Sequence, residues 1–252
     1  MKFRVLIPAR YAATRLPGKP LIDIGGRPMI AWVHERAQAA GPTSVAVATD
    51  SEEIQAACLS LGIKVEMTSS THVSGTDRIA EVARRARWAD DQIVVNVQGD
   101  EPLVPPGVIR QVAAMLAAAP DVAIATVAVP VESLEEFLDP NVVKVVCDRA
   151  GRALYFSRAP IPWNRDSARE GWASQSSWDG ALRHLGIYAY RVGALVRIAA
   201  LPPTALEQRE RLEQLRAVES GFDIRVEIAA ERPPPGVDTA ADLERVRRLI
   251  RT

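Results

Sequence analysis

Three cationic side chains lie close together near the start of the chain. Arg10, Arg15 and Lys19 fall within ten residues, after the apolar run Phe3 to Ile7, which is typical of a β-strand. Ligands of open α/β sheets bind beyond the carboxyl ends of the strands, where this segment would lie. Arginine can hold two phosphate oxygens at once and lysine supplies a point charge, so a polyphosphate ligand is favoured over a solvated basic loop. The spacing matches neither the P-loop nor the dinucleotide-binding glycine pattern.

A pair of carboxylates follows a second apolar run. In "IVVNVQGDEPL" the run ends at Val97 and is followed by Gln98, Asp100 and Glu101. Charge at the end of a buried strand needs a partner, and Mg²⁺ prefers carboxylate oxygen and bridges to substrate phosphates. The alternative is that both acids are turn residues before Pro102, and the residues alone leave the two interpretations nearly even.

A third acidic position precedes the last helical pattern. In "GVDTAADLERV", Thr239 is predicted to cap a helix, with Asp242 three residues further on. Asp238 then lies one residue outside the helix and could supply a second metal carboxylate. The alternative is that Asp238 itself caps the helix, which is the commoner role for an acid at such a position.

The elements that must position these residues alternate in the first half of the chain. Short apolar runs alternate with helical patterns up to about Pro130, which predicts a mostly parallel sheet with helices on both faces. The rhythm then breaks into strand-like runs, so we expect a single domain over 1–252 with an inserted antiparallel lobe at roughly 131–200. The stretch 163–180 has no period and is predicted to be a mobile loop. The predicted strands are 3–7, 44–49, 64–67, 93–97, 122–129, two within 141–158 joined by the turn "DRAG", 184–191 and 224–228. The predicted helices are 28–40, 51–61, 76–86, 105–119, 206–219 and 240–251.

Composition narrows the class of protein. The chain has 252 residues, 31 basic and 31 acidic, so no bulk charge indicates nucleic acid or an anionic membrane as partner. No run approaches 18 apolar residues and Pro8 and Arg10 interrupt any leader, so the cytoplasm is the expected location. Cys58 and Cys147 have no metal-ligand spacing and are predicted to be reduced thiols in the core.

Taken together, the motifs resemble those of the 3-deoxy-manno-octulosonate cytidylyltransferases, or CMP-Kdo synthetases, over nearly the whole chain. They are "IPARYAATRLPGKPL", "HVSGTDRIAEV", "VNVQGDEPL", "NVVKVV", "LYFSRAPIPW", "RHLGIYAYR", "LEQLR" and "GVDTAADLERVR". The resemblance implies a Rossmann-like fold with a dimerisation lobe, hence a homodimer. It also implies the reaction of CTP with the sugar acid Kdo to give CMP-Kdo and diphosphate, in lipopolysaccharide synthesis.

The resemblance also implies roles for individual residues, by motif. The CTP phosphates would be held by Arg10, Arg15 and Lys19, and the cytosine and ribose would lie near Ala9, Arg78 and Gln98. Mg²⁺ would be held by Asp100 and Asp238. The sugar acid would be surrounded by Arg158, His184, Tyr188, Glu213 and Gln214. Arg15, Lys19 and the two metal carboxylates would carry catalysis, and Asp100 would also contact CTP. The chain departs from the family at Ala13, where a serine is usual, which removes one hydroxyl near the nucleotide.

Other functions are compatible with parts of this pattern. The same chemistry could act on 8-amino-Kdo or a sialic acid, which would change only the sugar pocket, although His184, Tyr188, Glu213 and Gln214 follow the Kdo pattern. A UDP- or GDP-sugar synthase is disfavoured because its loop after the first strand usually begins with glycines. A catalytically silent nucleotide sensor is disfavoured because Arg15, Lys19, Asp100 and Asp238 are all present.

Overall fold

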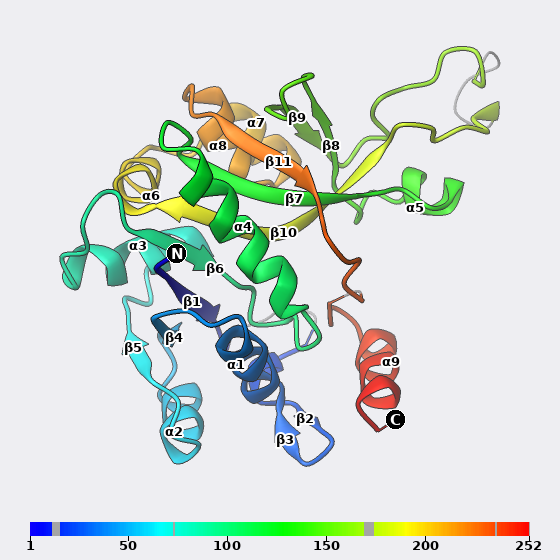
Figure 1. Cartoon of the computed structure of the whole chain (residues 1–252). Helices are drawn as coiled ribbons and strands as arrows, with labels where there is room; N and C mark the ends of the chain where they lie inside the picture. The colour runs from blue at the N-terminus through cyan, green and yellow to red at the C-terminus, as the bar shows by residue number, and fades with distance from the viewer. Residues whose placement is uncertain (12–15, 73, 169–173, 235, 252) are drawn as a thin grey trace.

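A mixed β-sheet forms the centre of the molecule (Figure 1). The computed structural model describes residues 1–11, 16–72, 74–168, 174–234 and 236–251. Within them the strand order is β11-β7-β10-β6-β1-β4-β5, with β8 and β9 attached beside β10. The strands are β1 (Phe3–Ala9), β4 (Ser44–Thr49), β5 (Val65–Met67), β6 (Ile93–Asn96), β7 (Ile124–Pro130), β8 (Lys144–Cys147), β9 (Ala153–Ser157), β10 (Leu182–Arg191) and β11 (Ile224–Ile228), and a separate small ribbon pairs β2 (Asp23–Ile24) with β3 (Arg27–Pro28).

The sheet is mostly parallel, as predicted. β1 pairs in parallel with β4 and β6, β4 with β5, and β7 with β11. β10 alone on the main path runs the other way, between β6 and β7. The carboxyl ends of β1, β4, β6, β7 and β11 therefore share one edge, which is where ligands of such sheets bind.

Helices cover both faces of the sheet, as Figure 1 shows. α1, α2 and α4 pack on one face, and α3 and α6 pack together on the other. The helices are α1 (Met29–Ala39), α2 (Glu52–Ser60), α3 (Gly75–Arg85), α4 (Pro106–Ala118), α5 (Leu134–Leu138), α6 (Val192–Ala199), α7 (Ala205–Glu210), α8 (Gln214–Glu219) and α9 (Ala240–Arg251), with the 3-10 turn η1 (Lys19–Leu21). None of the described helices is long and apolar enough to cross a membrane. Cys58 is a free thiol in the core, as predicted, and Cys147 is a half-buried free thiol.

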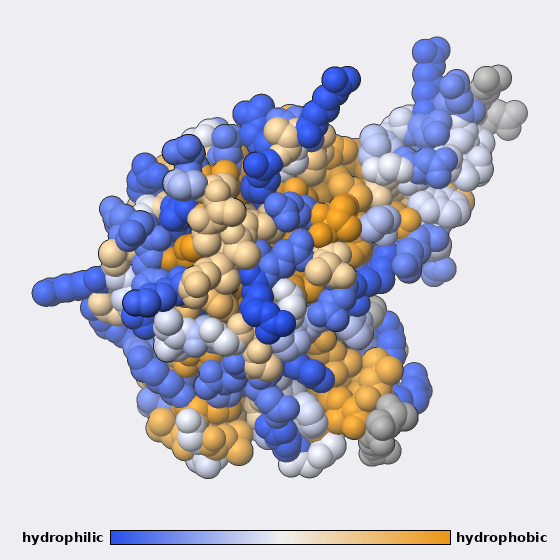
Figure 2. Space-filling view, in the orientation of Figure 1, coloured by the Kyte–Doolittle hydropathy of each residue, from blue (hydrophilic) through white to orange (hydrophobic). Residues whose placement is uncertain are grey.

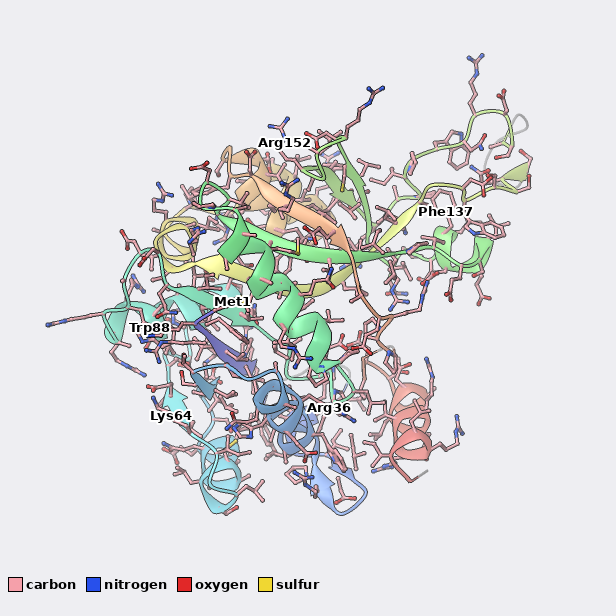
Figure 3. The ribbon with its side chains drawn as sticks, viewed as in Figure 1. Met1, Arg36, Lys64, Trp88, Phe137 and Arg152 are labelled. Atoms are coloured by element: carbon pink, nitrogen blue, oxygen red, sulfur yellow. The ribbon has the colours of Figure 1, made fainter. Side chains whose placement is uncertain are left out.

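Part of the predicted lobe projects from the body as an arm. We use this name for α5 and the described residues of 159–181, which extend beyond the sheet in Figure 1 and project from the surface in Figure 2. Phe137, labelled in Figure 3, is fully buried there against Val131 and Ala181. The last part of the predicted lobe lies elsewhere: Tyr188 and Tyr190 pair with β6 and β7, so the carboxyl half of β10 belongs to the central sheet. The predicted mobile loop 163–180 has no α-helix or strand among its described residues, and 169–173 lie outside them.

The predicted helix over 206–219 is wrong in one respect. Two short helices, α7 and α8, replace it, because Arg211 adopts the left-handed conformation with φ of 56° and turns the chain. Residues 206–219 contain neither glycine nor proline, so the sequence carried no sign of the turn. The break places Glu213 at the start of α8 rather than in the middle of a helix.

Candidate active site

The loop after β6 crosses tightly over the end of β1. A side chain at Gly99 would place its Cβ 2.9 Å from the carbonyl oxygen of Pro8. Only glycine permits that approach, so Gly99 brings Asp100 and Gln98 against the carboxyl ends of the two central strands. The predicted position of these groups at the sheet edge follows from this packing.

The segment before α9 docks onto the same loop. Val237 donates its backbone N–H to the carbonyl oxygen of Asp100 at 2.9 Å. A Cβ at Gly236 would lie 2.8 Å from Oε1 of Glu101 and 3.2 Å from the carbonyl oxygen of Asp100, so the two segments are closely packed there. Asp238 is thereby placed beside Asp100, although 138 positions separate them in the sequence.

The predicted cap of the last helix is confirmed. Thr239 Oγ1 accepts from the backbone N–H of Asp242 at 3.2 Å, and Asp242 Oδ2 accepts from the N–H of Thr239 at 2.9 Å. Two N–H groups of the helix start are satisfied by these side chains. Asp238 also donates its backbone N–H to Asp242 at 3.2 Å, while its own side chain is left to point elsewhere.

One ammonium group joins the two predicted metal carboxylates. Lys19 Nζ donates to Asp100 Oδ2 at 2.7 Å and to Asp238 Oδ1 at 3.0 Å. Burial lowers the pKa of Lys19, but attraction to Asp100 and then Asp238 outweighs it, so the pKa is raised overall. The three predicted residues are therefore brought together. Arg10 directly follows β1, whereas Arg15 and Ala13 lie outside the described residues.

A large open cavity extends from Asp238 along the sheet edge. It has a volume of about 1280 Å³ and lies between the arm and the start of α9, where Figure 2 shows the surface hollowed. Of the predicted site residues, the cavity is lined by Gln98, His184, Tyr188, Glu213, Gln214 and Asp238. Four of the five residues predicted for the sugar acid thus surround one space.

The wall contributed by β10 is buried and neutral. His184 and Tyr188 lie on the same face, as predicted, with ring centroids 5.2 Å apart. Burial lowers the pKa of His184 to about 3, so its imidazole is neutral at physiological pH. Thr126 on β7 holds the ring, with Oγ1 lying 2.9 Å from His184 Nε2. Burial also raises the pKa of Tyr188, which keeps its hydroxyl protonated.

Glu213 lies on the α8 side of the same wall. Its Oε2 accepts from Thr76 Oγ1 at 2.8 Å, which ties the start of α8 to the start of α3. Burial raises the pKa of Glu213, and the neighbouring Asp77 adds to the effect. Glu101 is a further carboxyl in the cavity wall, and burial, followed by the charge of Asp100, raises its pKa to about 8.

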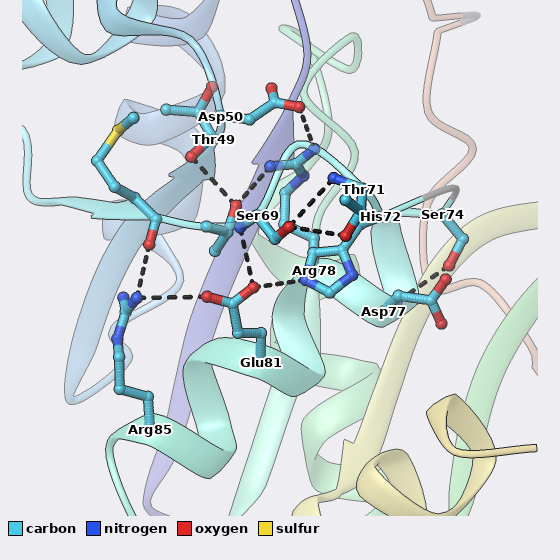
Figure 4. Close-up of polar contacts among 12 residues, drawn as sticks. Thr49, Asp50, Ser69, Thr71, His72, Ser74, Asp77, Arg78, Glu81 and Arg85 are labelled. Carbon is cyan, nitrogen blue, oxygen red and sulfur yellow. Dashed lines mark hydrogen bonds and ion pairs between the residues drawn. The ribbon is translucent and has the colours of Figure 1, made fainter.

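The arginine predicted to lie near the cytosine and ribose, Arg78, is on α3, and its guanidinium reaches Asp50 at the end of β4 (Figure 4). Arg78 is fully buried and donates from Nη2 to Asp50 Oδ2 at 2.8 Å and from Nη1 to Thr68 Oγ1. His72 Nε2 lies 2.5 Å from Glu81 Oε2 in the adjoining network. Ala9 is buried at the end of the neighbouring strand β1. These residues do not line the cavity described above. They lie near the ends of β1 and β4, which follow β10 and β6 in the strand order.

Arg158 is placed differently from the other predicted sugar-binding residues. Among the described residues, it is absent from the cavity wall. Its Nε donates to the carbonyl oxygen of Glu210 at 2.8 Å and its Nη1 to that of Pro140 at 3.0 Å. Its own carbonyl accepts from the buried ammonium of Lys144 at 2.8 Å. In this conformation Arg158 joins segments behind the wall, and its contact with a sugar acid stays a prediction.

Sequence reasoning missed some residues that line the cavity. Thr76 and Asn96 are buried there, and Arg183 is paired with Glu136 at 2.8 Å. Asn96 had a visible signal, since an amide interrupts the apolar run "IVVNV". In the described part of the chain, no group of three or more His, Cys, Asp or Glu residues is arranged to hold a metal ion.

Comparison with known proteins places this geometry in a family. A model of the cytidylyltransferase family matches residues 4–226. The 3-deoxy-manno-octulosonate cytidylyltransferase of Thioalkalivibrio sulfidiphilus is 54% identical over 100% of both chains, and that of Tolumonas auensis is 55% identical over 99% of this chain and 97% of its own.

Solved structures agree with these matches. A CMP:2-keto-3-deoxy-manno-octonic acid synthetase complexed with CTP is 43% identical, with a TM-score of 0.88 over 100% of this chain and 99% of that one. A cytidylyltransferase from Leptospira borgpetersenii, 17% identical, shares the fold with a TM-score of 0.64 over 100% of this chain and 87% of its own. On its motifs, its fold and its full-length similarity, this chain belongs to the 3-deoxy-manno-octulosonate cytidylyltransferases within the cytidylyltransferase family.

Proposed function

We propose that this protein transfers the cytidylyl group of CTP to Kdo, giving CMP-Kdo and diphosphate. The observation that carries the proposal is one cavity with two unlike ends. Asp238, which Lys19 joins to Asp100, brings charge to one end, and His184 and Tyr188 form a buried, neutral wall at the other. A charged nucleotide and a polyhydroxylated sugar acid need these two environments side by side.

We further propose Mg²⁺ as the metal, with Asp100 and Asp238 as its protein ligands. In support, an oxygen of each carboxylate is already directed at one cation, the Lys19 ammonium, at 2.7 and 3.0 Å. Two carboxylates suffice because Mg²⁺ keeps waters and uses substrate phosphates as its remaining ligands. When bound, it supplies charge neutralisation at the α-phosphate and lowers the pKa of the attacking hydroxyl.

Positioning is the main work left to the side chains. The anomeric hydroxyl of Kdo attacks the α-phosphorus of CTP in line, the bond to diphosphate breaks, and the hydroxyl proton is lost. Arg10, Arg15 and Lys19 would offset the charge that develops on diphosphate. Lys19 is suited to this role because its ammonium already lies beside both carboxylates and needs only to turn towards the phosphates.

In this proposal, the predicted site residues contact different parts of the two substrates. His184, Tyr188, Glu213 and Gln214 would contact the sugar acid, together with Arg158 if its guanidinium turns inward. Ala9, Arg78 and Gln98 would lie near the cytosine and ribose. A homodimer joined through the lobe at 131–200, a cytoplasmic location and a role in lipopolysaccharide synthesis are parts of the same proposal.

The direct test is diphosphate release from CTP and Mg²⁺ with Kdo, 8-amino-Kdo or a sialic acid as acceptor. Release with Kdo that stops on addition of EDTA is the expected result. Release only with another acceptor would keep the chemistry and refute the assignment of the sugar. Binding of CTP without release for any acceptor would favour a nucleotide-sensing protein.

A further inference from the structure

Asn96 is a polar residue in an otherwise apolar part of the sheet. It ends β6, only 2% of its surface is exposed, and its register partners are Leu6 on β1 and Tyr188 on β10. The rest of β6, Ile93 to Val95, is buried and apolar. A leucine or valine would satisfy the packing at this position, so folding alone does not account for the amide.

Within the described ranges, the side-chain oxygen of Asn96 lacks the partner that buried polar atoms normally have. Among the described residues, no donor reaches its Oδ1, and the hydroxyl of the neighbouring Tyr188 is likewise without a partner. Buried polar side-chain atoms in folded proteins are bonded in the large majority of cases, so each exception needs an explanation. Two such exceptions on adjacent strands, in register with each other, point to a common cause.

Both groups line the cavity. Asn96 and Tyr188 belong to its wall with Thr76 and Glu213, but Thr76 and Glu213 already bond to each other at 2.8 Å. In this wall, Thr76 and Glu213 are therefore already hydrogen-bonded, whereas Asn96 Oδ1 and the Tyr188 hydroxyl are free, within the described part of the chain, to bond a ligand. An amide presents a donor or an acceptor according to how it is rotated, and a phenol can do either.

We propose that Asn96 is a specificity-determining residue that hydrogen-bonds a hydroxyl group of the sugar acid, next to Tyr188. The inference rests on the proposed function and extends it to a residue outside the predicted site. A hydroxyl suits the position because it donates and accepts, as the amide does, and brings no charge into a buried place. The nucleotide base is the poorer match, since Asp50 and Arg78 lie at the end of β4, on the far side of β1.

The first experiment replaces the amide by a hydrocarbon of similar size, Asn96→Leu. The melting temperature of the free enzyme should stay the same or rise, because an unpaired buried amide is removed. The KM for Kdo should rise about tenfold or more, as expected for one lost hydrogen bond, while the KM for CTP stays within about twofold. If Asn96 only supported the fold, the substitution would instead lower the melting temperature and change the KM values for Kdo and CTP by the same factor.

The second experiment identifies the hydroxyl. Wild-type protein and Asn96→Leu are assayed with Kdo and its 4-, 5-, 7- and 8-deoxy analogues. For one analogue, wild-type kcat/KM should fall about tenfold or more relative to Kdo, and Asn96→Leu should abolish that difference, because the missing hydroxyl has already lost its partner. Equal discrimination by both proteins, or a rise in the KM for CTP alone, would overturn the inference.

Gln92→Met is the matched control. Gln92 precedes β6 at the opposite end, its Nε2 donates to the carbonyl of Ile93 at 3.2 Å, and it is not part of the cavity wall. Its loss should leave discrimination among the analogues unchanged. If Asn96→Leu does not fold, Asn96→Val removes the amide with a smaller hydrocarbon side chain and carries the same expectations. Turnover of Kdo by the wild-type protein tests the proposed function separately, so the two failures are distinguishable.

Discussion

The two ends of the cavity are built from different kinds of side chain. At the phosphate end, Asp100 and Asp238 have side chains that are 37% and 57% exposed, lie on loops, and are held by the flexible chain of Lys19. At the sugar end, His184 and Tyr188 are buried, lie on a strand, and are kept neutral by desolvation. The difference indicates that charge is presented for catalysis at one end, while shape and hydrogen bonding are preorganised at the other.

This contrast predicts how substitutions divide between activity and stability. Exposed ion pairs contribute little to folding, so changes at the phosphate end should reduce turnover and leave stability almost unchanged. Buried polar groups with satisfied partners contribute to both, so changes behind the sugar end should reduce stability as well as binding. The predictions below test this division, beginning with the largest effect.

Asp100→Asn should reduce kcat by roughly 100-fold or more, because the variant loses a carboxylate proposed to hold Mg²⁺. The free energy of unfolding should change by less than about 1 kcal/mol, because the Asp100 side chain is 37% exposed and Lys19 keeps Asp238 as a partner at 3.0 Å. Diphosphate release under saturating substrates and urea denaturation measure the two quantities. Asp223→Asn is the control, since Asp223 is also an exposed acid, 63% by its side chain, but lies before β11. Near-normal turnover of Asp100→Asn would refute the role of this carboxylate.

Lys144→Met should, in contrast to Asp100→Asn, reduce stability and weaken binding of Kdo. The Lys144 ammonium is fully buried and donates to three carbonyl oxygens, those of Asp139, Val142 and Arg158, at 2.6 to 2.9 Å. Losing these bonds leaves buried acceptors unpaired, so unfolding should become easier by about 3 kcal/mol. Asp139 and Val142 line the cavity, so the KM for Kdo should rise while the KM for CTP is kept.

Urea denaturation and steady-state kinetics with each substrate varied in turn test this prediction. Lys64→Met is the matched control, since the Lys64 side chain is 64% exposed and pairs only with Glu66 among the described residues. A loss of stability with both KM values unchanged would show that Lys144 supports the fold without shaping the sugar end.

The pH dependence of stability should reveal the buried imidazole. The pKa of His184 is about 3 in the folded protein, against an ordinary value of 6.5. Between these values the unfolded chain binds the proton and the folded protein does not, so stability falls as pH decreases from 6.5 towards 3. His184 should contribute a slope of up to about 1.4 kcal/mol per pH unit, and His184→Gln should remove it.

The comparison of wild type and variant isolates His184 from the carboxylates that titrate in the same range. His34→Gln serves as control, because burial also lowers the pKa of that half-buried histidine on α1, away from the cavity. If His184→Gln has the same slope as wild type between pH 4 and 6, the imidazole is not held neutral by the fold.

The same contrast explains how much could be predicted from the sequence. The strands near 44–49, 93–97 and 224–228 were located because apolar periodicity is a local signal. Asp100 and Asp238 were recognised because each stands next to a local feature, a strand end and a helix cap. The resemblance to a family implied that both hold Mg²⁺, but their contact with Lys19 was not predicted, since no local pattern encodes a contact across 138 positions.

What the sequence could not indicate depends on packing between distant segments. Asn96 became a candidate only when its register with Tyr188 and its missing partner were known. Lys144 stands in an apolar strand pattern that does not show which carbonyls surround it. The break at Arg211 has no local signal because no glycine or proline stands between 206 and 219. Each of these features is a property of three-dimensional neighbours rather than of residue order.

Thr239→Ala gives the smallest effect and tests whether the two ends differ as sharply as proposed. Removing the hydroxyl that caps α9 should cost about 1 kcal/mol of stability. Because Asp242 accepts from the N–H groups of both Thr239 and Asp238, loss of the cap should also loosen the Asp238 carboxylate and lower kcat a few-fold. Ser51→Ala removes a comparable cap, bonded to Ile54 at 3.2 Å, from α2. Equal losses of stability with a lower kcat only in Thr239→Ala would show that the phosphate end also depends on a rigid element. Unchanged kcat in both would mean that Asp238 is positioned by its contacts with Lys19 and the Asp100 loop alone.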